Sequence, residues 1–188
     1  MVPAPLVVVL DANVLFPFTI RDTLLRAAAS GLYQLRWSAQ ILDEMERNLV
    51  STGAMTAPKA KRLRAIMTRE FPDAEVTGYE PLISAMKNHE KDRHVVAAAV
   101  KAGAQVVTTS NLRDFASLPD GIEGQSPDLF LTSLFDLQPA LFVDLLREQA
   151  RDLVKPPMAL DELLDRLARV APELVAAVQD RLANRADE

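Results

Sequence analysis

Four acidic residues have the type and the setting to hold divalent cations. Asp11 follows an apolar run in VVVLDANVL, Glu44 lies in ILDEMERNL, Asp92 precedes RHVVAAAV, and Asp114 closes VVTTSNLRD. Mg²⁺ and Mn²⁺ prefer hard oxygen ligands such as carboxylates. A cation held this way lowers the pKa of a bound water and stabilises charge that builds on a phosphodiester. The four acids together therefore favour metal-dependent hydrolysis of a phosphate ester, which needs no covalent nucleophile.

Each of these acids also has a simpler explanation when it is taken alone. Asp11 could close an Asx-turn after its strand, and Asp92 could be a helix N-cap that contributes about 1 kcal/mol. Glu44 could be a solvated residue at the border of an apolar helix face, and Asp114 could cap a turn. The order of all four along the chain, rather than any single one, favours a shared site.

Composition excludes several other kinds of chemistry. The 188 residues include no cysteine, which excludes a disulfide framework, a thiolate zinc site and a cysteine nucleophile. The net charge of -5 argues mildly against a generic nucleic-acid binder, although bound cations invert the local field. The most basic stretch, Lys59 to Arg69, could contact RNA phosphates, but a solvated helix face is the more common explanation.

Strands and helices alternate over the first two thirds of the chain. Apolar patterning predicts strands at 6–10, 33–37 and 105–109, and helices at 21–30, 38–50, 58–71 and 92–103. Ser38 is the expected N-cap of its helix and Gly103 the expected C-cap of another. Residues 76–82 allow only a short extended piece. This alternation predicts a parallel sheet, whose ligands gather beyond the carboxyl ends of the strands, where Asp11 and residues 110–114 lie.

The last third of the chain reads as helical only. From about Pro139 the pattern is amphipathic, with a break at Pro156-Pro157 and one or two helices over residues 160–183, around Pro172. The first ten residues lack a basic leader and are too short to span a bilayer. Together with the absence of cysteine, this predicts a cytoplasmic protein that makes no membrane contact.

The DANVL, DRHVVAAA and TTSNLRDF segments, in this order, resemble the PIN-domain family of nucleases, in particular VapC-type toxins of bacterial toxin–antitoxin pairs. The resemblance runs from about Leu6 to Leu137. It implies an α/β fold in which helices flank a PIN-like parallel β-sheet. We therefore expect a PIN-like nuclease domain over residues 1–137 and a C-terminal helical extension over 138–188.

The resemblance also implies which residues bind metal. Asp11, Glu44 and Asp92 match the three most characteristic acids of the family, which bind Mg²⁺ or Mn²⁺. Asn111 stands where many members have a fourth acid, so the sequence departs from the commonest pattern there. Similarity to members with an Asn-x-x-Asp segment implies that Asp114 supplies the missing charge.

Further residues are expected to orient this site. Asn13 and Thr109 match polar positions that, by the resemblance, orient the acids or a bound water. Arg93 is expected to pair with a nearby acid or to contact substrate, and His94 to be a helix histidine at the edge of the core. Arg21-Asp22 could form part of the rim of the site or be a solvated helix start.

The function implied by the resemblance is a metal-dependent endoribonuclease that cleaves RNA through a metal-activated water. Its partners would be a protein antitoxin that covers the acidic groove and, as in many members, a second copy in a homodimer. Two alternatives stay open. An aspartate-based phosphatase would need a second Asp where the chain has Asn13. A catalytically silent PIN-like interaction module is favoured by the departure at Asn111.

Overall fold

Two units make up the structure, a computed structural model that describes residues 5–153 and 157–186. The first unit comprises Met1–Phe16 and Tyr33–Gln125, and the second comprises Pro17–Leu32 and Ser126–Glu188. The expected break at Pro156-Pro157 includes a position outside the described residues. The domain boundaries expected from the sequence, 1–137 and 138–188, stay a prediction.

The first unit is built on a sheet of four parallel strands. They are β1 (Val7–Leu10), β2 (Gln34–Arg36), β3 (Val106–Thr108) and β4 (Glu123–Gln125), in the spatial order β2-β1-β3-β4. Val8 of β1 is in register with Leu35 on one side and Val106 on the other. Because β1 is central and covered on both faces, its Val8, Val9 and Leu10 are fully buried. The predicted α/β fold with a parallel sheet is confirmed.

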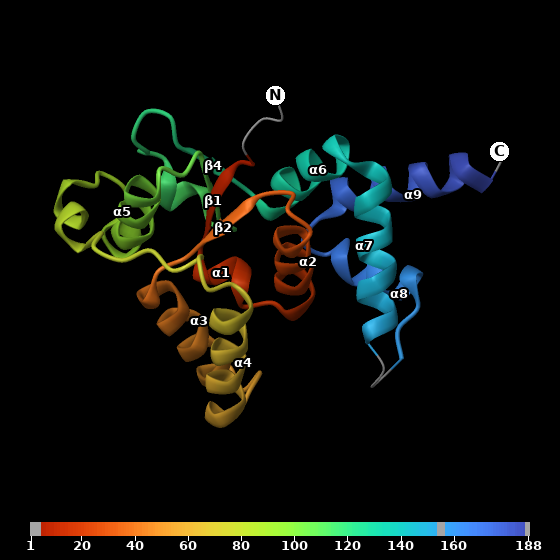
Figure 1. The fold of residues 1–188 in the computed structure, drawn as a ribbon, viewed down its shortest axis with the longest axis horizontal. Helices are drawn as coiled ribbons and strands as arrows, with labels where there is room; N and C mark the ends of the chain where they lie inside the picture. The colour runs from red at the N-terminus through yellow and green to blue at the C-terminus, as the bar shows by residue number, and fades with distance from the viewer. Residues whose placement is uncertain (1–4, 154–156, 187–188) are drawn as a thin grey trace. The chain divides into compact units, whose positions relative to one another are not determined.

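Helices flank this sheet within the first unit (Figure 1). They are α1 (Ala12–Leu15), α3 (Ala39–Ser51), α4 (Ala57–Glu70) and α5 (Arg93–Ala102), with 3-10 turns η1 (Glu80–Ala85), η2 (Glu90–Asp92) and η3 (Leu112–Phe115). The alanine-rich α5 packs on β1 and β3 and ends at Gly103, whose φ of 63° suits glycine. The Ser38 hydroxyl accepts a hydrogen bond from Ile41 N at 3.2 Å, which confirms Ser38 as the N-cap of α3.

The sequence predictions are wrong in two details of the first unit. Residues 76–82 do not form an extended piece: a single bridge pairs Trp37 with Glu75, and a 3-10 turn begins at Glu80. Strand β4 was not expected, because its residues Glu-Gly-Gln carry no apolar pattern. An edge strand that pairs only with β3 needs few apolar residues, so hydrophobic patterning does not reveal it.

The second unit consists of helices. They are α2 (Phe18–Ala29), α6 (Pro127–Leu137), α7 (Pro139–Asp152), α8 (Leu160–Leu167) and α9 (Pro172–Ala186). Within this unit α2 packs on α7 and α8, while α6 packs on α9 and α7. The expected helical segment over residues 160–183 is two helices, and Pro172 opens the second of them. Among residues 5–153 and 157–186, no helix combines the length and apolar character that a membrane crossing requires.

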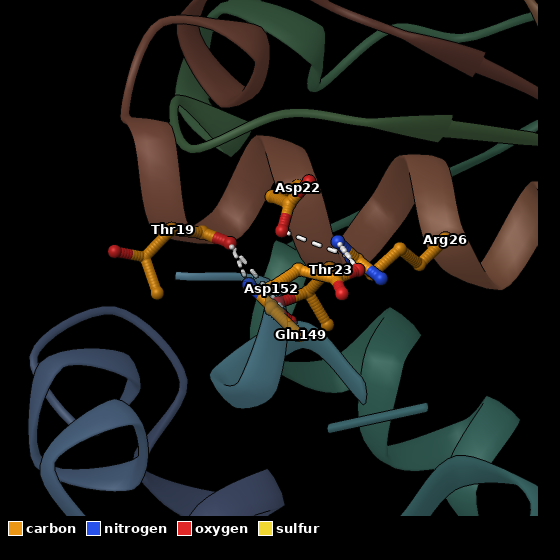
Figure 2. Close-up of polar contacts among 6 residues, drawn as sticks. All are labelled: Thr19, Asp22, Thr23, Arg26, Gln149 and Asp152. Carbon is orange, nitrogen blue, oxygen red and sulfur yellow. Dashed lines mark hydrogen bonds and ion pairs between the residues drawn. The ribbon is translucent and has the colours of Figure 1, made fainter. Parts of the chain in front are cut away.

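A buried glutamine joins α2 to α7 (Figure 2). Gln149 of α7 and Thr23 of α2 are both fully buried. Gln149 Oε1 accepts a hydrogen bond from Thr23 Oγ1 at 2.9 Å, and Gln149 Nε2 donates to the Thr19 carbonyl at 3.2 Å. Buried polar groups are costly unless they are paired, so these bonds specify how the two helices fit together.

An arginine on the same helix reinforces this contact from a more exposed position. Arg26 Nε donates to Asp22 Oδ2 one helical turn earlier on α2, at 3.0 Å. Arg26 Nη2 donates to Asp152 Oδ2, at the end of α7, at 2.9 Å. Figure 2 shows Arg26 between the two carboxylates. The early helix α2 is therefore tied by polar contacts to a helix that lies far along the chain.

Candidate active site

Three predicted residues meet where β1 and β3 end. Asp11 directly follows β1, and its backbone N–H donates to the Thr108 carbonyl of β3 at 3.0 Å. Asp11 is only 4% exposed, and its Oδ2 accepts from Thr109 Oγ1 at 2.8 Å and from Asn13 Nδ2 at 2.6 Å. Asn13 Nδ2 also donates to Thr109 Oγ1 at 2.9 Å. The side chains of Asp11, Asn13 and Thr109 thus form a closed hydrogen-bonded triangle.

The loop after β3 is fixed to this triangle by backbone donors. Ser110 N donates to Asn13 Oδ1 at 2.9 Å, and Asn111 N donates to Thr109 Oγ1 at 3.1 Å. The nitrogen and the oxygen of the Asn13 side-chain amide, and the hydroxyl of Thr109, therefore all have defined partners. The position of Asn111 relative to Asp11 follows directly from these bonds.

The electrostatic surroundings of Asp11 disfavour its charged form. Burial, the largest cause, raises the pKa of Asp11 to about 6, from an ordinary value of 3.8. The hydrogen bond from Thr109 lowers the pKa, while the carboxylates of Asp92 and Glu44 raise it further. Charges that act on a buried carboxyl are screened less than charges in water. Glu44 and Asp92 are therefore close enough to Asp11 for their charges to act on it, and we refer to these three acids as one acidic cluster.

Asp92 and Asp114 form the other side of the cluster, together with His89. One ligand atom from each of the three side chains lies within 4.8 Å of the others. Backbone bonds support this arrangement, since His89 N donates to the Asp114 carbonyl at 3.1 Å and Asp92 N to the His89 carbonyl at 2.9 Å. Burial and then the charge of Asp114 raise the pKa of Asp92. Asp92 stands at the N-cap position of α5, yet its side chain makes no capping hydrogen bond.

Glu44 of α3 faces a histidine of α5. His94 is 2% exposed, and its Nε2 lies 3.4 Å from Glu44 Oε1. Its Nδ1 lies 2.9 Å from the Lys91 carbonyl, which can only accept, so Nδ1 carries a hydrogen. Burial lowers the pKa of His94, but the Glu44 carboxylate and the Lys91 carbonyl outweigh it, and the pKa is raised. His94 is the buried helix histidine expected from the sequence, and it also contacts a predicted site residue.

The remaining predicted residues take different positions. Asn111 stands where many family members have an acid, and its Nδ2 donates to Asp114 Oδ2 at 2.5 Å. The amide therefore holds the carboxylate of Asp114. Arg93 Nε donates to the Asn88 carbonyl at 3.3 Å. Within residues 5–153 and 157–186 no acid pairs with Arg93, so the expected ion pair is not found. Arg21 and Asp22 lie in the second unit.

The sequence predictions missed His89 altogether and did not foresee the contact of His94 with Glu44. His89 lies three residues before Asp92, and His94 lies two residues after it. The HEKDRH segment placed both near a predicted acid, which was a usable signal. Their contacts with Asp114 and Glu44, however, join segments far apart in the chain, and spacing alone does not reveal such contacts.

The donor set fits a hard divalent cation. Asp11, Glu44, Asp92 and Asp114 offer carboxylate oxygens, and His89 offers a nitrogen close to two of them. Nearby basic groups act on two of these acids: His94 Nε2 lies 3.4 Å from Glu44 Oε1, and the charge of Lys91 lowers the pKa of Asp92. Burial and the repulsion between the acids nevertheless raise the pKa of both Asp11 and Asp92, and Mg²⁺ or Mn²⁺ would relieve both effects.

Comparisons with known proteins agree with this geometry. The PIN-domain family matches residues 7–113, more than half of the chain, and the VapC50 C-terminal domain matches residues 127–180. A protein of Mycobacterium tuberculosis named "Putative ribonuclease VapC50" is 39% identical over 102 residues, which are 53% of this chain and 60% of that relative. No solved structure gives a significant match. The match over residues 7–113 shows that the chain belongs to the PIN-domain family.

Proposed function

We propose that this chain is a metal-dependent endoribonuclease and the toxin of a toxin–antitoxin pair. The observation that carries the proposal is the convergence of Asp11, Glu44, Asp92 and Asp114 at the carboxyl edge of a parallel sheet, in a member of the PIN-domain family. The name of the Mycobacterium tuberculosis relative supports the ribonuclease and toxin assignments. That relative is matched over 60% of its length, so its whole activity is carried over here only as a proposal.

The four acids are the proposed metal ligands. When bound, Mg²⁺ or Mn²⁺ would supply an acidified water as nucleophile and stabilise the charge on the phosphate and the leaving oxygen. Two side chains fix the Asp11 carboxylate, because both Thr109 and Asn13 donate to its Oδ2. A carboxylate held in one orientation loses less conformational freedom when it binds a cation.

Asp114 is proposed to replace the acid that is missing at Asn111. The Asn111 amide donates to Asp114 Oδ2 and thereby orients this carboxylate toward the cluster with Asp92 and His89. On the other side, His94 Nε2 lies 3.4 Å from Glu44 Oε1, close enough for an ion pair. The orienting or substrate-binding role expected for Arg93 stays a prediction.

The partners and location are also proposals. A single-stranded RNA would be the substrate, since chemistry on an exposed phosphodiester requires access to the acidic edge. An antitoxin covering this edge and a homodimer follow from the family resemblance alone. A cytoplasmic location is proposed because the RNA substrate is found there.

Labelled single-stranded RNA tests the proposed function. The purified chain is incubated with the RNA in Mg²⁺ or Mn²⁺ and then in chelator, alongside Asp11→Asn. Asp136→Asn, at an exposed acid of α6, is the matched control. We expect cleavage that requires metal, is lost in Asp11→Asn without loss of the fold, and survives in Asp136→Asn. Equal cleavage by Asp11→Asn and the native chain would overturn the mechanism.

The silent interaction module remains the second candidate, because Asn111 occupies a position where many family members have an acid. Thermal unfolding with and without Mn²⁺ separates the two: a metal site in the folded state raises the melting temperature. No stabilisation together with no cleavage would favour the module. The phosphatase alternative is disfavoured, since the Asn13 amide is bonded to Asp11 and an amide cannot act as general acid.

A further inference from the structure

Helix α4 concentrates positive charge in a chain of net charge -5. Its 14 residues include a single acid, Glu70, and five cations: Lys59, Lys61, Arg62, Arg64 and Arg69. The helix belongs to the same unit as the acidic cluster and packs on α3, the helix that carries Glu44 (Figure 1). Its charge therefore lies on a helix that packs against α3, one of the helices of the candidate active site.

The inner face of α4 uses one of these cations for packing. Ala60 and Met67 are buried on one face of this helix, which packs against α3. Arg64, on the same face, pairs with Asp43 and, at 3.5 Å, with Glu46 of α3. The charge of Arg64 is thus committed to holding the two helices together.

The outer face of α4 carries exposed cations that take part in no ion pair within the described residues. Lys59, Lys61 and Arg62 are exposed, and none of them has an acid within ion-pair distance in residues 5–153 and 157–186. Lys59 and Arg62 are three residues apart, a spacing at which like charges destabilise a helix by a few tenths of a kcal/mol. A polyanion bound along this face would remove that repulsion.

The outer face favours phosphates over an apolar protein segment. Ile66 is the only large apolar residue exposed on α4, at 39%. A protein partner normally needs a buried apolar anchor, whereas a nucleic-acid backbone needs only cations at its phosphates. An acidic active site repels RNA, so a separate basic surface on the same unit would supply the affinity that the site itself lacks.

We propose that Lys59, Lys61 and Arg62 on the outer face of α4 bind the phosphate backbone of RNA. The choice of RNA rests on the proposed function. No aromatic side chain lies on α4 to stack with a base, so the contact is independent of sequence. Phosphate contacts position a nucleic acid without reading it. The surface therefore sets how tightly RNA binds and leaves the choice of cleavage site to other residues.

The test compares two triple variants of the full chain. Lys59→Ala, Lys61→Ala and Arg62→Ala are combined in the first, because alanine preserves helix formation. The control combines Lys101→Ala, Arg151→Ala and Arg169→Ala, which removes the same net charge from exposed positions elsewhere. Far-ultraviolet circular dichroism and thermal melts verify that both variants fold.

Binding of a fluorescent single-stranded RNA is measured in chelator, so that no cleavage occurs, from about 50 to about 200 mM salt. Each lost contact with a single strand reduces the slope of log affinity against log salt by about 0.7. We expect the α4 variant to show a slope shallower by about 2 and, by the same relation, binding weaker by about 400-fold at about 50 mM salt, and the control to match the native chain.

Equal slopes and affinities in the two variants would overturn the proposal, as would a native chain that binds no RNA at low salt. The assay does not depend on catalysis. If the α4 variant loses binding while the native chain cleaves no RNA with any metal, the nuclease proposal fails and the α4 surface stands. If the native chain cleaves RNA and both variants bind it equally, the α4 proposal fails and the nuclease proposal stands.

Discussion

The hydroxyl of Thr109 donates a hydrogen bond to the carboxylate of Asp11 at 2.8 Å, across 98 positions of sequence. The two residues follow neighbouring parallel strands, β3 and β1, at the same edge of the sheet. Both are buried, and Thr109 also accepts from Asn13 and from Asn111 N. Thr109 therefore links Asp11 to the loop that carries Asp114.

Replacing this threonine tests its role in orientation. Thr109→Val keeps the shape of the side chain but removes the donor to Asp11, so the carboxylate loses a bond that favours its charged form. We expect cleavage to slow by about 10- to 100-fold, as for other partners of metal ligands, and Mn²⁺ to bind more weakly. Thr109→Ser, which retains the hydroxyl, should remain near the native rate. A valine variant with native activity and native metal affinity would contradict an orienting role.

The raised pKa of Asp11 predicts how stability depends on pH without metal. The folded protein holds the Asp11 proton up to about pH 6, whereas the unfolded chain releases it near 3.8. The unfolded state therefore binds fewer protons between these values, and the free energy of unfolding falls as the pH rises through them. Two pKa units correspond to about 3 kcal/mol.

Asp11→Asn isolates this effect, because asparagine does not titrate. In chelator, the stability of Asp11→Asn relative to the native chain should increase by up to about 3 kcal/mol between about pH 4 and pH 6, and then stay level. Urea unfolding at a series of pH values measures it. Saturating Mn²⁺ at neutral pH should reverse the order, since the cation stabilises only the native chain. A difference that is constant with pH would refute the assignment of a perturbed carboxyl at Asp11.

Sequence patterns predicted much of the site because apolar runs show where the strands end. The apolar runs before Asp11 and Thr109 predicted two parallel strands, and the edge where such strands end predicted that these residues meet. The contact of Glu44 with His94 was not predictable in the same way, because a helix pattern gives the buried face but not the residue opposite. His89 reaches Asp114 through a loop whose path depends on tertiary contacts.

The place of α2 shows a second limit. Its apolar positions predicted a helix near residues 21–30, and the structure has one over Phe18–Ala29. Nothing in that pattern indicated that Thr23 bonds to Gln149 or that Arg26 bonds to Asp152. Hydrophobic periodicity indicates which face of a helix is buried, but not which element covers that face. For α2, polar contacts with residues far along the chain specify that α7 covers it.

The pairing of His94 with Glu44 predicts a coupling that depends on pH. The pKa of His94 is raised in the folded protein, so its stabilising contribution is complete below about 6.5 and is lost as the pH rises through the folded value. A double-mutant cycle with His94→Leu and Glu44→Gln, followed by urea unfolding in chelator, measures the interaction. We expect a coupling of about 0.5 to 3 kcal/mol near pH 6 that shrinks at about pH 9. Additive effects at both pH values would show that the two side chains do not interact.

The buried bond between Thr23 and Gln149 predicts an asymmetry between single and double variants. Thr23→Val removes the donor and leaves Gln149 Oε1 buried without that hydrogen bond, which costs about 1 to 3 kcal/mol. Combining it with Gln149→Met replaces both polar groups by apolar ones of similar shape, and such replacements are often close to neutral. The double variant should therefore be more stable than Thr23→Val in urea unfolding. If the two losses simply added, the bond would not be what holds α2 to α7, and Arg26 with Asp152 would become the contact to test.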